Sequence, residues 1–112
     1  MKTHSEEVCR LSGYNLRSIA DAVDTAYSAM IENLEAAHKG ALTSIVNAYN
    51  CEDRINELRN TLRDAEIEEM ESGEKTYQAS VYYMDIVNEF ERMGDFLINI
   101  SQALESSFVG KK

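Results

Sequence analysis

Apolar residues recur every three or four positions along nearly the whole chain, and this spacing sets the expected secondary structure. An amphipathic helix places such residues on one face, whereas a half-buried strand would need strict alternation. The chain contains no proline and is rich in residues that favour helices. The pattern predicts three long helices and no sheet, over about residues 4–38, 41–71 and 75–107.

Each predicted helix has an apolar stripe, which we expect to face a common core. The first stripe consists of Leu16, Ile19, Val23, Ala26, Met30 and Leu34. The second consists of Ile45, Tyr49, Ile55, Leu58, Leu62 and Ala65. The third consists of Tyr83, Ile86, Phe90, Met93, Leu97, Ile100 and Leu104.

Helix start and stop signals separate the three stretches. Thr3 and Glu6 have the spacing of a capping box, and Gly40 and Gly73 suit the left-handed residue that follows a helix. Short connections make consecutive helices antiparallel neighbours. We therefore expect an all-α fold, an antiparallel up-down-up three-helix bundle that forms one domain over residues 1–112.

Charge and composition exclude several classes of partner. The chain carries a net charge of −9, which repels nucleic-acid phosphates and anionic lipid head groups. Cys9 and Cys51 form no C-x-x-C pair, which indicates thiols in a reducing compartment. The polar N-terminus is unlike a signal peptide, and no stretch is apolar enough to span a membrane. We expect the segment itself to be soluble and cytoplasmic.

The interior of the third predicted helix raises a chemical question. Gly94 lies there between Glu91 and Asp95, although glycine costs about 1 kcal/mol relative to alanine inside a helix. If the second turn is centred near residues 72–73, residues whose numbers sum to about 145 lie at one height. Glu52 and Asn56 then occupy the same slice of the bundle as Glu91 and Asp95. A glycine in this slice allows a neighbouring helix or a ligand to approach closely.

Carboxylates gathered beside a core need a cation, a proton or a basic partner. Oxygen ligands suit Mg²⁺, Mn²⁺ or Ca²⁺, and carboxylate-rich bundles also hold iron. Glu52, Asn56, Glu91 and Asp95 are therefore candidate oxygen ligands for such a cation. The alternative is that these acids are solvated or paired with one of three nearby arginines, Arg54, Arg59 or Arg92.

A second possible metal motif is weaker. Glu35 and His38 have the Glu-x-x-His spacing of ferritin-like di-iron bundles, but those sites need two such motifs and two further glutamates. Glu52 lies about 10 Å from the level of Glu35 along the axis. A surface or capping histidine is the better interpretation. The chain also has no phosphate loop and no recognisable nucleophile elbow, so we expect no enzyme activity.

The segment "YYMDIVNEFERMGDFLINI" resembles the closing helix of PhoU-family domains, and "CEDRINELRNTL" is similar to the middle helix of that family. The matching positions of the closing helix are Tyr83, Asp85, Glu91, Arg92, Gly94, Asp95, Asn99 and Ile100. The resemblance covers about residues 45–105. It implies a cytoplasmic helical bundle that regulates phosphate uptake and phosphate signalling.

The resemblance also implies a metal site, because E-x-x-x-D motifs of the family bind metal clusters. Glu52, Glu91 and Asp95 would then be ligands for iron, zinc, manganese or magnesium, and Asn56 stands where the family often has aspartate. Typical members hold two three-helix repeats, whereas this chain holds one. In that respect it is similar to the C-terminal domain of bacterial sodium/phosphate cotransporter family proteins, which implies a place at the cytoplasmic face of the membrane.

Two functions follow as expectations. One is a regulatory domain that senses phosphate, held through a bound metal, and gates a transporter membrane domain or a phosphate-signalling protein. The other is a metal-independent helical module for protein–protein interaction or oligomerisation. A single repeat is expected to form a dimer, which would complete a six-helix arrangement.

Overall fold

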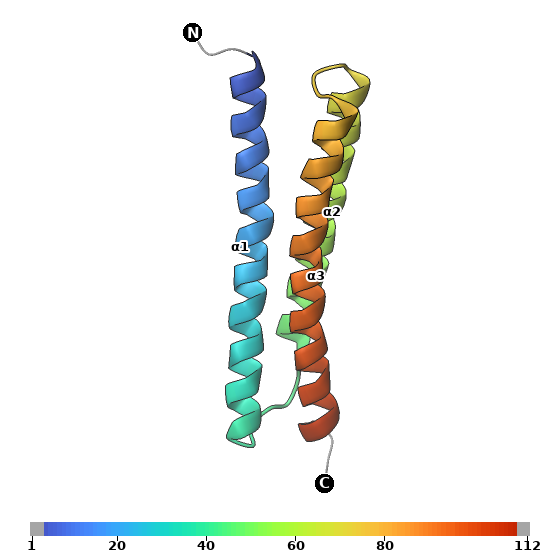
Figure 1. Cartoon of the computed structure of the whole chain (residues 1–112). Coiled ribbons are helices and arrows are strands. Elements are labelled where there is room, and N and C mark those ends of the chain that lie inside the picture. The colour runs from blue at the N-terminus through green and yellow to red at the C-terminus, as the bar shows by residue number, and fades with distance from the viewer. Residues whose placement is uncertain (1–3, 110–112) are drawn as a thin grey trace.

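Three long helices make up the fold. The structure, a computed structural model, describes the backbone of residues 4–109 and the side chains from Leu16 to Val109. The helices are α1 (His4–His38), α2 (Val46–Glu71) and α3 (Tyr77–Phe108), and each packs against both others. Figure 1 shows α1 and α3 running in one direction with α2 antiparallel to both. The predicted all-α, up-down-up bundle is confirmed. The capping box at Thr3 lies outside the described residues.

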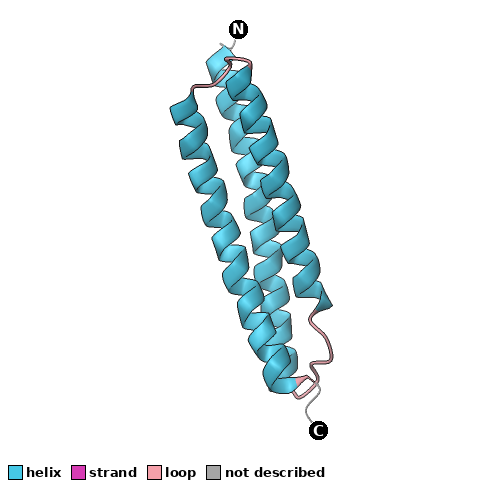
Figure 2. Cartoon of the chain, turned by 90° about the vertical axis from the view of Figure 1, so that its right-hand side faces the viewer, coloured by secondary structure: helices cyan, strands magenta, loops and turns pink. Residues whose placement is uncertain are grey.

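The bundle is slender, at 62 × 24 × 16 Å. Figure 2 shows the two connecting loops confined to the two ends of the bundle. Length and narrowness together mean that each helix has a wide face directed away from its two neighbours. Among the described residues, no helix is long and apolar enough to cross a membrane.

Helices α1 and α2 end in the same way. In each, a glycine with positive φ follows the last turn, Gly40 with φ 70° and Gly73 with φ 80°. The next amide donates back to the carbonyl five residues earlier, from Ala41 to Ala36 (2.8 Å) and from Glu74 to Glu69 (3.0 Å). This is a Schellman arrangement, which satisfies carbonyls left over at a helix end and turns the chain sharply. Both predicted stops are confirmed.

The start of α2 differs from the prediction. The helix begins at Val46, not near residue 41, and residues 41–45 form an irregular connection. The Ser44 hydroxyl accepts a hydrogen bond from the Val46 amide (3.1 Å), a local bond that competes with a helical turn. Ile45 is buried at the end of the bundle against Ala48 and Ile98, so the connection has to cross that end before the helix starts.

The start of α3 is also displaced, from residue 75 to Tyr77. Thr76 is the N-cap, and its side chain accepts a hydrogen bond from the Ala79 amide (3.1 Å). An N-cap residue has non-helical backbone angles, so the helix cannot include it. Lys75 therefore belongs to the turn, and its side chain reaches back to Glu66 on α2.

The core lies between all three helices along most of their length. Its main cluster consists of Ile19, Val23, Ala26, Ile55, Leu62, Tyr83 and Val87. Part of each predicted stripe is correct, but Leu34 and Tyr49 are exposed, and Asn33, Ala37 and Ala48 are buried instead. Asn33 and Ala48 are each offset by one residue from the predicted position, and Ala37 continues the buried face of α1 beyond the predicted stripe.

The largest offset is in α3, where two apolar stripes run side by side. The buried positions are Ser80, Tyr83, Val87, Gly94, Ile98 and Ser101. The predicted core residues Ile86, Met93 and Ile100 are exposed, as are Tyr82 and Phe96. Because glycine and serine occupy the tightest part of the core, the larger apolar residues one position away face outward.

Candidate functional site

The predicted ligands lie along one flank of the α2–α3 pair. Glu52, Asn56 and Arg59 recur on α2 at steps of four and three, so they share a helix face. That face is directed at α3, because the Arg59 guanidinium forms an ion pair with Glu91 there. Asp95 follows Glu91 by one turn on α3. Helical spacing and this one contact therefore place all four predicted ligands along the same flank.

Their relative heights differ from the prediction. Ile55 contacts Gly94 and Arg59 contacts Glu91, so residue numbers at one height sum to about 150 and not to about 145. The turn and its N-cap extend to Thr76, which shifts α3 by about 7 Å along α2. Glu91 is therefore level with Arg59, and Glu52 lies more than a turn away along the axis.

Gly94 is explained by a close approach between helices. A Cβ atom added at residue 94 would lie 2.8 Å from Cδ1 of Ile55, closer than carbon atoms pack. Ile55 is itself almost fully buried in the main core cluster. The expectation that a neighbouring helix approaches Gly94 is confirmed, and the approaching group is an apolar side chain of α2.

One of the predicted metal ligands, Glu91, already has a basic partner. The alternative of an arginine partner holds for Glu91, whose carboxylate is bound by Arg59, and the same guanidinium also donates to Asn60 (3.2 Å). Asp95 is exposed, and Glu52 and Asn56 are half-buried. Among the side chains that the structure describes, no three His, Cys, Asp or Glu residues are gathered so that they could hold a metal ion. Metal binding by Glu52, Asn56, Glu91 and Asp95 therefore stays a prediction, and in this structure the Glu91 carboxylate is bound by Arg59.

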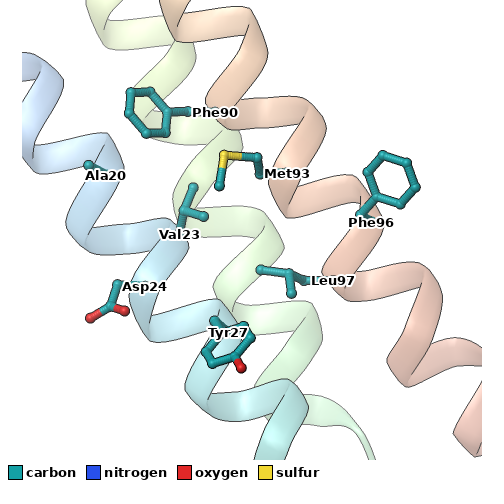
Figure 3. A pocket seen from close by; sticks show the side chains of 8 residues that line it. All are labelled: Ala20, Val23, Asp24, Tyr27, Phe90, Met93, Phe96 and Leu97. Carbon is teal, nitrogen blue, oxygen red and sulfur yellow. The ribbon is translucent and has the colours of Figure 1, made fainter.

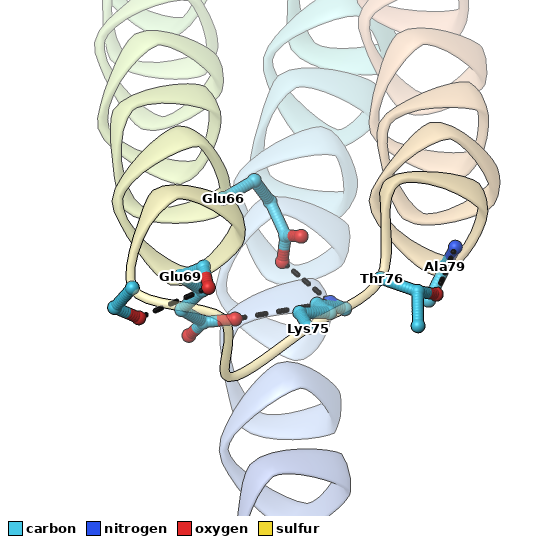
Figure 4. A network of polar contacts seen from close by, with 6 residues as sticks. Glu66, Glu69, Lys75, Thr76 and Ala79 are labelled. Carbon is cyan, nitrogen blue, oxygen red and sulfur yellow. Dashed lines mark hydrogen bonds and ion pairs between the residues drawn. The ribbon is translucent and has the colours of Figure 1, made fainter.

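A buried charge cluster lies at the α2–α3 turn (Figure 4). The Lys75 ammonium donates to Glu66 Oε1 (2.7 Å), lies 4.0 Å from Glu69 Oε2 and sits 4.2 Å from the centre of the Tyr83 ring. Glu66 is only 4% exposed. Oε2 of Glu66, Oε2 of Glu69 and Oγ of Ser80 are buried without a hydrogen-bond partner in the protein. The cluster thus holds two carboxylates and one lysine in little water.

Burial raises the pKa of the Glu69 carboxyl above its ordinary value of 4.5, and the negative charge of Glu66 raises it further. Lys75 acts in the opposite direction but does not cancel these effects. The folded protein therefore favours the protonated form of Glu69 more than the unfolded chain does. This makes the turn a pH-dependent element of the fold.

At the opposite end of the bundle, a polar contact joins all three helices. The Asn33 side-chain amide on α1 donates to Asn47 Oδ1 on α2 (3.1 Å) and to Ser101 Oγ on α3 (3.2 Å). Asn33 is 4% exposed and Ser101 is fully buried. Hydrogen bonds of this kind are directional, so they fix the heights of the three helices relative to one another.

A groove of about 450 Å³ runs between α1 and α3 (Figure 3). Its lining consists of Ala20, Val23, Asp24, Tyr27, Phe90, Met93, Phe96 and Leu97. Figure 3 shows Val23 and Tyr27 extending from α1, and Met93 and Leu97 from α3, toward the space between the two helices. Asp24 is its one charged residue. The groove is thus an apolar surface open to solvent.

Among the side chains that are described, the remaining candidate ligands and thiols belong to no group that could hold a metal ion. Glu35 and His38 are exposed at the end of α1, as expected for a surface histidine. Cys51 is half-buried, and its burial raises the pKa of the thiol, which makes it a poor nucleophile. The side chains of His4 and Cys9 lie outside the part of the chain whose side chains are described.

Comparison with known families identifies the bundle. The family description "PhoU domain" matches residues 16–104, which is most of the three helices. The chain belongs to the PhoU domain family. Searches of curated proteins and of solved structures return no match. PhoU domains are associated with the regulation of phosphate transport, and they are regulatory and not catalytic.

Sequence reasoning missed three features of this PhoU domain. The ion pair between Lys75 and Glu66 could not be predicted from the sequence, because it depends on where the turn ends and α3 starts. Asn33 was overlooked, since a lone asparagine in an apolar stripe has no signal of its own. The groove had a readable signal: Tyr82, Ile86, Met93, Phe96 and Ile100 repeat with a period near 3.5, one residue away from the buried stripe.

Proposed function

We propose that this PhoU domain is the regulatory part of a sodium-dependent phosphate cotransporter and acts on its membrane domain at the cytoplasmic face. The observation that carries the proposal is the family match over residues 16–104, because PhoU domains are associated with the regulation of phosphate transport. The resemblance to the C-terminal domains of such cotransporters supports this choice of transporter. The charge of −9 supports a protein partner over a nucleic acid or an anionic membrane surface.

Phosphate uptake tests this proposal directly. We would delete the codons for residues 16–104 at the chromosomal locus and measure sodium-dependent uptake of radiolabelled phosphate in cells grown in high and low phosphate. We expect uptake in the deletion strain to stop responding to external phosphate, because the regulatory element is gone. Uptake that responds normally in the deletion strain would contradict the proposal.

The second element of the proposal is metal-dependent sensing by the α2–α3 flank. Glu91 and Asp95, with Glu52 and Asn56, would supply oxygen ligands of the kind that hard or borderline divalent cations accept. A cation bound there would let an acidic domain hold phosphate. Since Arg59 occupies the Glu91 carboxylate, binding requires that Glu91 exchange this arginine for the metal.

This exchange predicts how two substitutions act. Elemental analysis would be made on the domain purified without chelator and again after dialysis against iron, zinc, manganese or magnesium. Arg59→Gln should raise the metal content, since it frees the Glu91 carboxylate, and Glu91→Ala should abolish it. Glu57→Ala is the matched control, because Glu57 is an exposed acid of α2 that pairs with Arg54 among the described side chains. Equal, negligible metal in all four proteins would refute metal sensing by this domain.

A second candidate function is a metal-independent interaction module, with a second copy of the chain as one possible partner. The specific observation in its favour is the groove between α1 and α3, whose apolar lining is solvent-exposed. Its discriminating property is partner binding or dimerisation that chelators do not change. Sedimentation of the domain with and without EDTA separates this function from metal-dependent assembly.

A further inference from the structure

We propose that the groove between α1 and α3 binds one amphipathic helix of a partner protein, whose apolar stripe is bordered by Lys or Arg. The inference rests on the proposed function for the partner's biological role, because a regulatory domain must contact what it regulates. The binding itself is argued from the groove alone.

The groove has the exposed apolar area that such a helix needs. Phe96 is 69% exposed, and Tyr27 and Met93 are each 51% exposed, while Val23 forms a buried floor. Covering an aromatic side chain buries about 150–250 Å² of its surface. Single exposed apolar residues are ordinary, but a contiguous strip with two aromatic rings on adjoining helices marks an interaction site.

The apolar strip is longer than the groove itself. Leu34 on α1 and Ile100 on α3 are also exposed, and the hydrogen bond from Asn33 to Ser101 shows that these positions lie at one height. At the other end, Ile86 extends the α3 stripe. From Ile86 to Ile100 the strip is about 21 Å long, which matches four turns of helix.

The geometry of the strip favours a helix as the occupant. Exposed apolar residues on α3 follow steps of three and four, the spacing that a facing helix can match with its own stripe. Helices α1 and α3 run parallel with a groove between them, and a fourth helix can pack in such a groove, as in a four-helix bundle. An extended peptide would instead need unpaired backbone groups to bind, and helices offer none along their length.

The charged residues beside the groove favour basic residues on either side of the partner helix's apolar stripe. Asp24 lines the groove, and Glu35 lies on nearly the same face of α1, eleven residues further on. On α3, Glu89 falls on the Met93–Phe96 face, where it pairs with Arg92. Arg17, seven residues before Asp24, adds a basic residue to that face of α1, so the acids outnumber the bases on the border by a small margin, on a chain with net charge −9. A basic helix gains favourable electrostatics there, whereas a second acidic copy or an anionic membrane is repelled.

The test uses labelled peptides and the intact domain. We would measure fluorescence anisotropy with a 20-residue helical peptide that carries leucines at steps of three and four, bordered by lysines. Two controls share its length: one replaces lysine by glutamate, and one has the basic sequence scrambled. We expect saturable binding of the basic helix at one peptide per domain, and at least tenfold weaker binding of both controls.

Domain variants decide whether the groove is the site. Phe96→Ser and Met93→Ser should each weaken binding about tenfold, and Asp24→Asn should weaken it and reduce its salt dependence. Ile67→Ser is the matched control, because Ile67 is an exposed apolar residue of α2 outside the groove. All four residues are exposed, so the fold should persist, which circular dichroism would check.

Several outcomes would overturn the proposal. Equal binding by the groove variants and Ile67→Ser would mean unspecific attraction to an acidic protein. Equal or better binding of the acidic helix would refute the charge argument. Sedimentation of the peptide-free domain as a dimer that Phe96→Ser dissociates would show a second copy as the occupant. No binding of the basic helix by the parent domain, together with a deletion strain that loses its phosphate response, would refute the groove alone. A deletion strain that responds normally to phosphate, together with groove-specific peptide binding, would refute the transport role alone.

Discussion

Ile55 of α2 sets its Cδ1 atom against the α carbon of Gly94 on α3, at a place where even a methyl group would be 2.8 Å away. This contact brings the two helices close beside the Arg59–Glu91 ion pair. A side chain on residue 94 would force either the Ile55 side chain or the neighbouring helix to shift. The glycine thus sets the spacing of the flank on which the predicted ligands lie.

The Ile55–Gly94 contact predicts energetic coupling between two substitutions. Gly94→Ala should lower the free energy of unfolding by about 1 kcal/mol, because overpacking outweighs the gain in helix propensity. Ile55→Val should cost about 1 kcal/mol through the lost methyl group. The double variant should cost clearly less than the two together, since valine lacks the clashing Cδ1. Urea unfolding followed by circular dichroism measures all four proteins, and strict additivity would contradict the contact.

The buried pair of Glu66 and Lys75 predicts an asymmetric response to mutation. Lys75→Met should destabilise the domain by about 3 kcal/mol, because it leaves the Glu66 carboxylate buried without a counter-charge. Replacing Glu66 by Met in the same protein should restore most of that loss. Arg54→Met is the control for replacing a basic residue by methionine. Arg54 and Glu57 are exposed, so their ion pair contributes little to stability. A double variant no more stable than Lys75→Met would be evidence against this account.

Glu69 predicts a pH-dependent stability. Because its pKa is raised in the folded state, its stabilising contribution is complete below 4.5 and is lost as the pH rises through the folded-state pKa. Glu69→Gln, which stays neutral, should match the parent in melting temperature near pH 4 and exceed it near pH 7. Glu71→Gln, an exposed position in the same last turn, should show no such gain. The prediction fails if Glu69→Gln melts below the parent at neutral pH.

The three-helix contact of Asn33 predicts a local but substantial effect. Asn33→Ala should lower the free energy of unfolding by about 2 kcal/mol, because it removes the donor to the buried Ser101 hydroxyl and one of the two donors to Asn47 Oδ1. Asn99→Ala, at an exposed position of α3, should change stability by less than about 0.5 kcal/mol. Thermal unfolding of the three proteins provides the comparison, and similar losses for both variants would argue against a structural role for Asn33.

The fold could be predicted from local signals. Apolar spacing defined three helices, and the glycines at residues 40 and 73 ended the first two because positive φ suits glycine better than other residues. The close approach at Gly94 was also foreseen, since glycine inside a helix needs a reason. These features depend on backbone sterics and helical period, both of which act within a few residues.

The candidate site depended on long-range geometry. The predicted centre of the turn was wrong by a few residues, so the prediction put Glu91 level with residue 54. In the structure Glu91 is level with Arg59, and this height decides that the two side chains form an ion pair. Likewise, the sequence shows two adjacent apolar stripes on α3 but cannot say which is buried. That choice is made by packing, because only the stripe containing Gly94 and Ser101 lets α1 and α2 come close.

By itself, then, the sequence determined an acidic, all-helical, three-helix domain with a glycine-marked contact and a resemblance to PhoU domains, because period, charge and turn chemistry are local properties. Only the tertiary structure decided that Arg59 meets Glu91, that Lys75 is buried between two carboxylates, and that Tyr27, Met93 and Phe96 remain exposed beside one groove. Each of these depends on the height and rotation of one helix against another, which side-chain packing fixes to within a single residue.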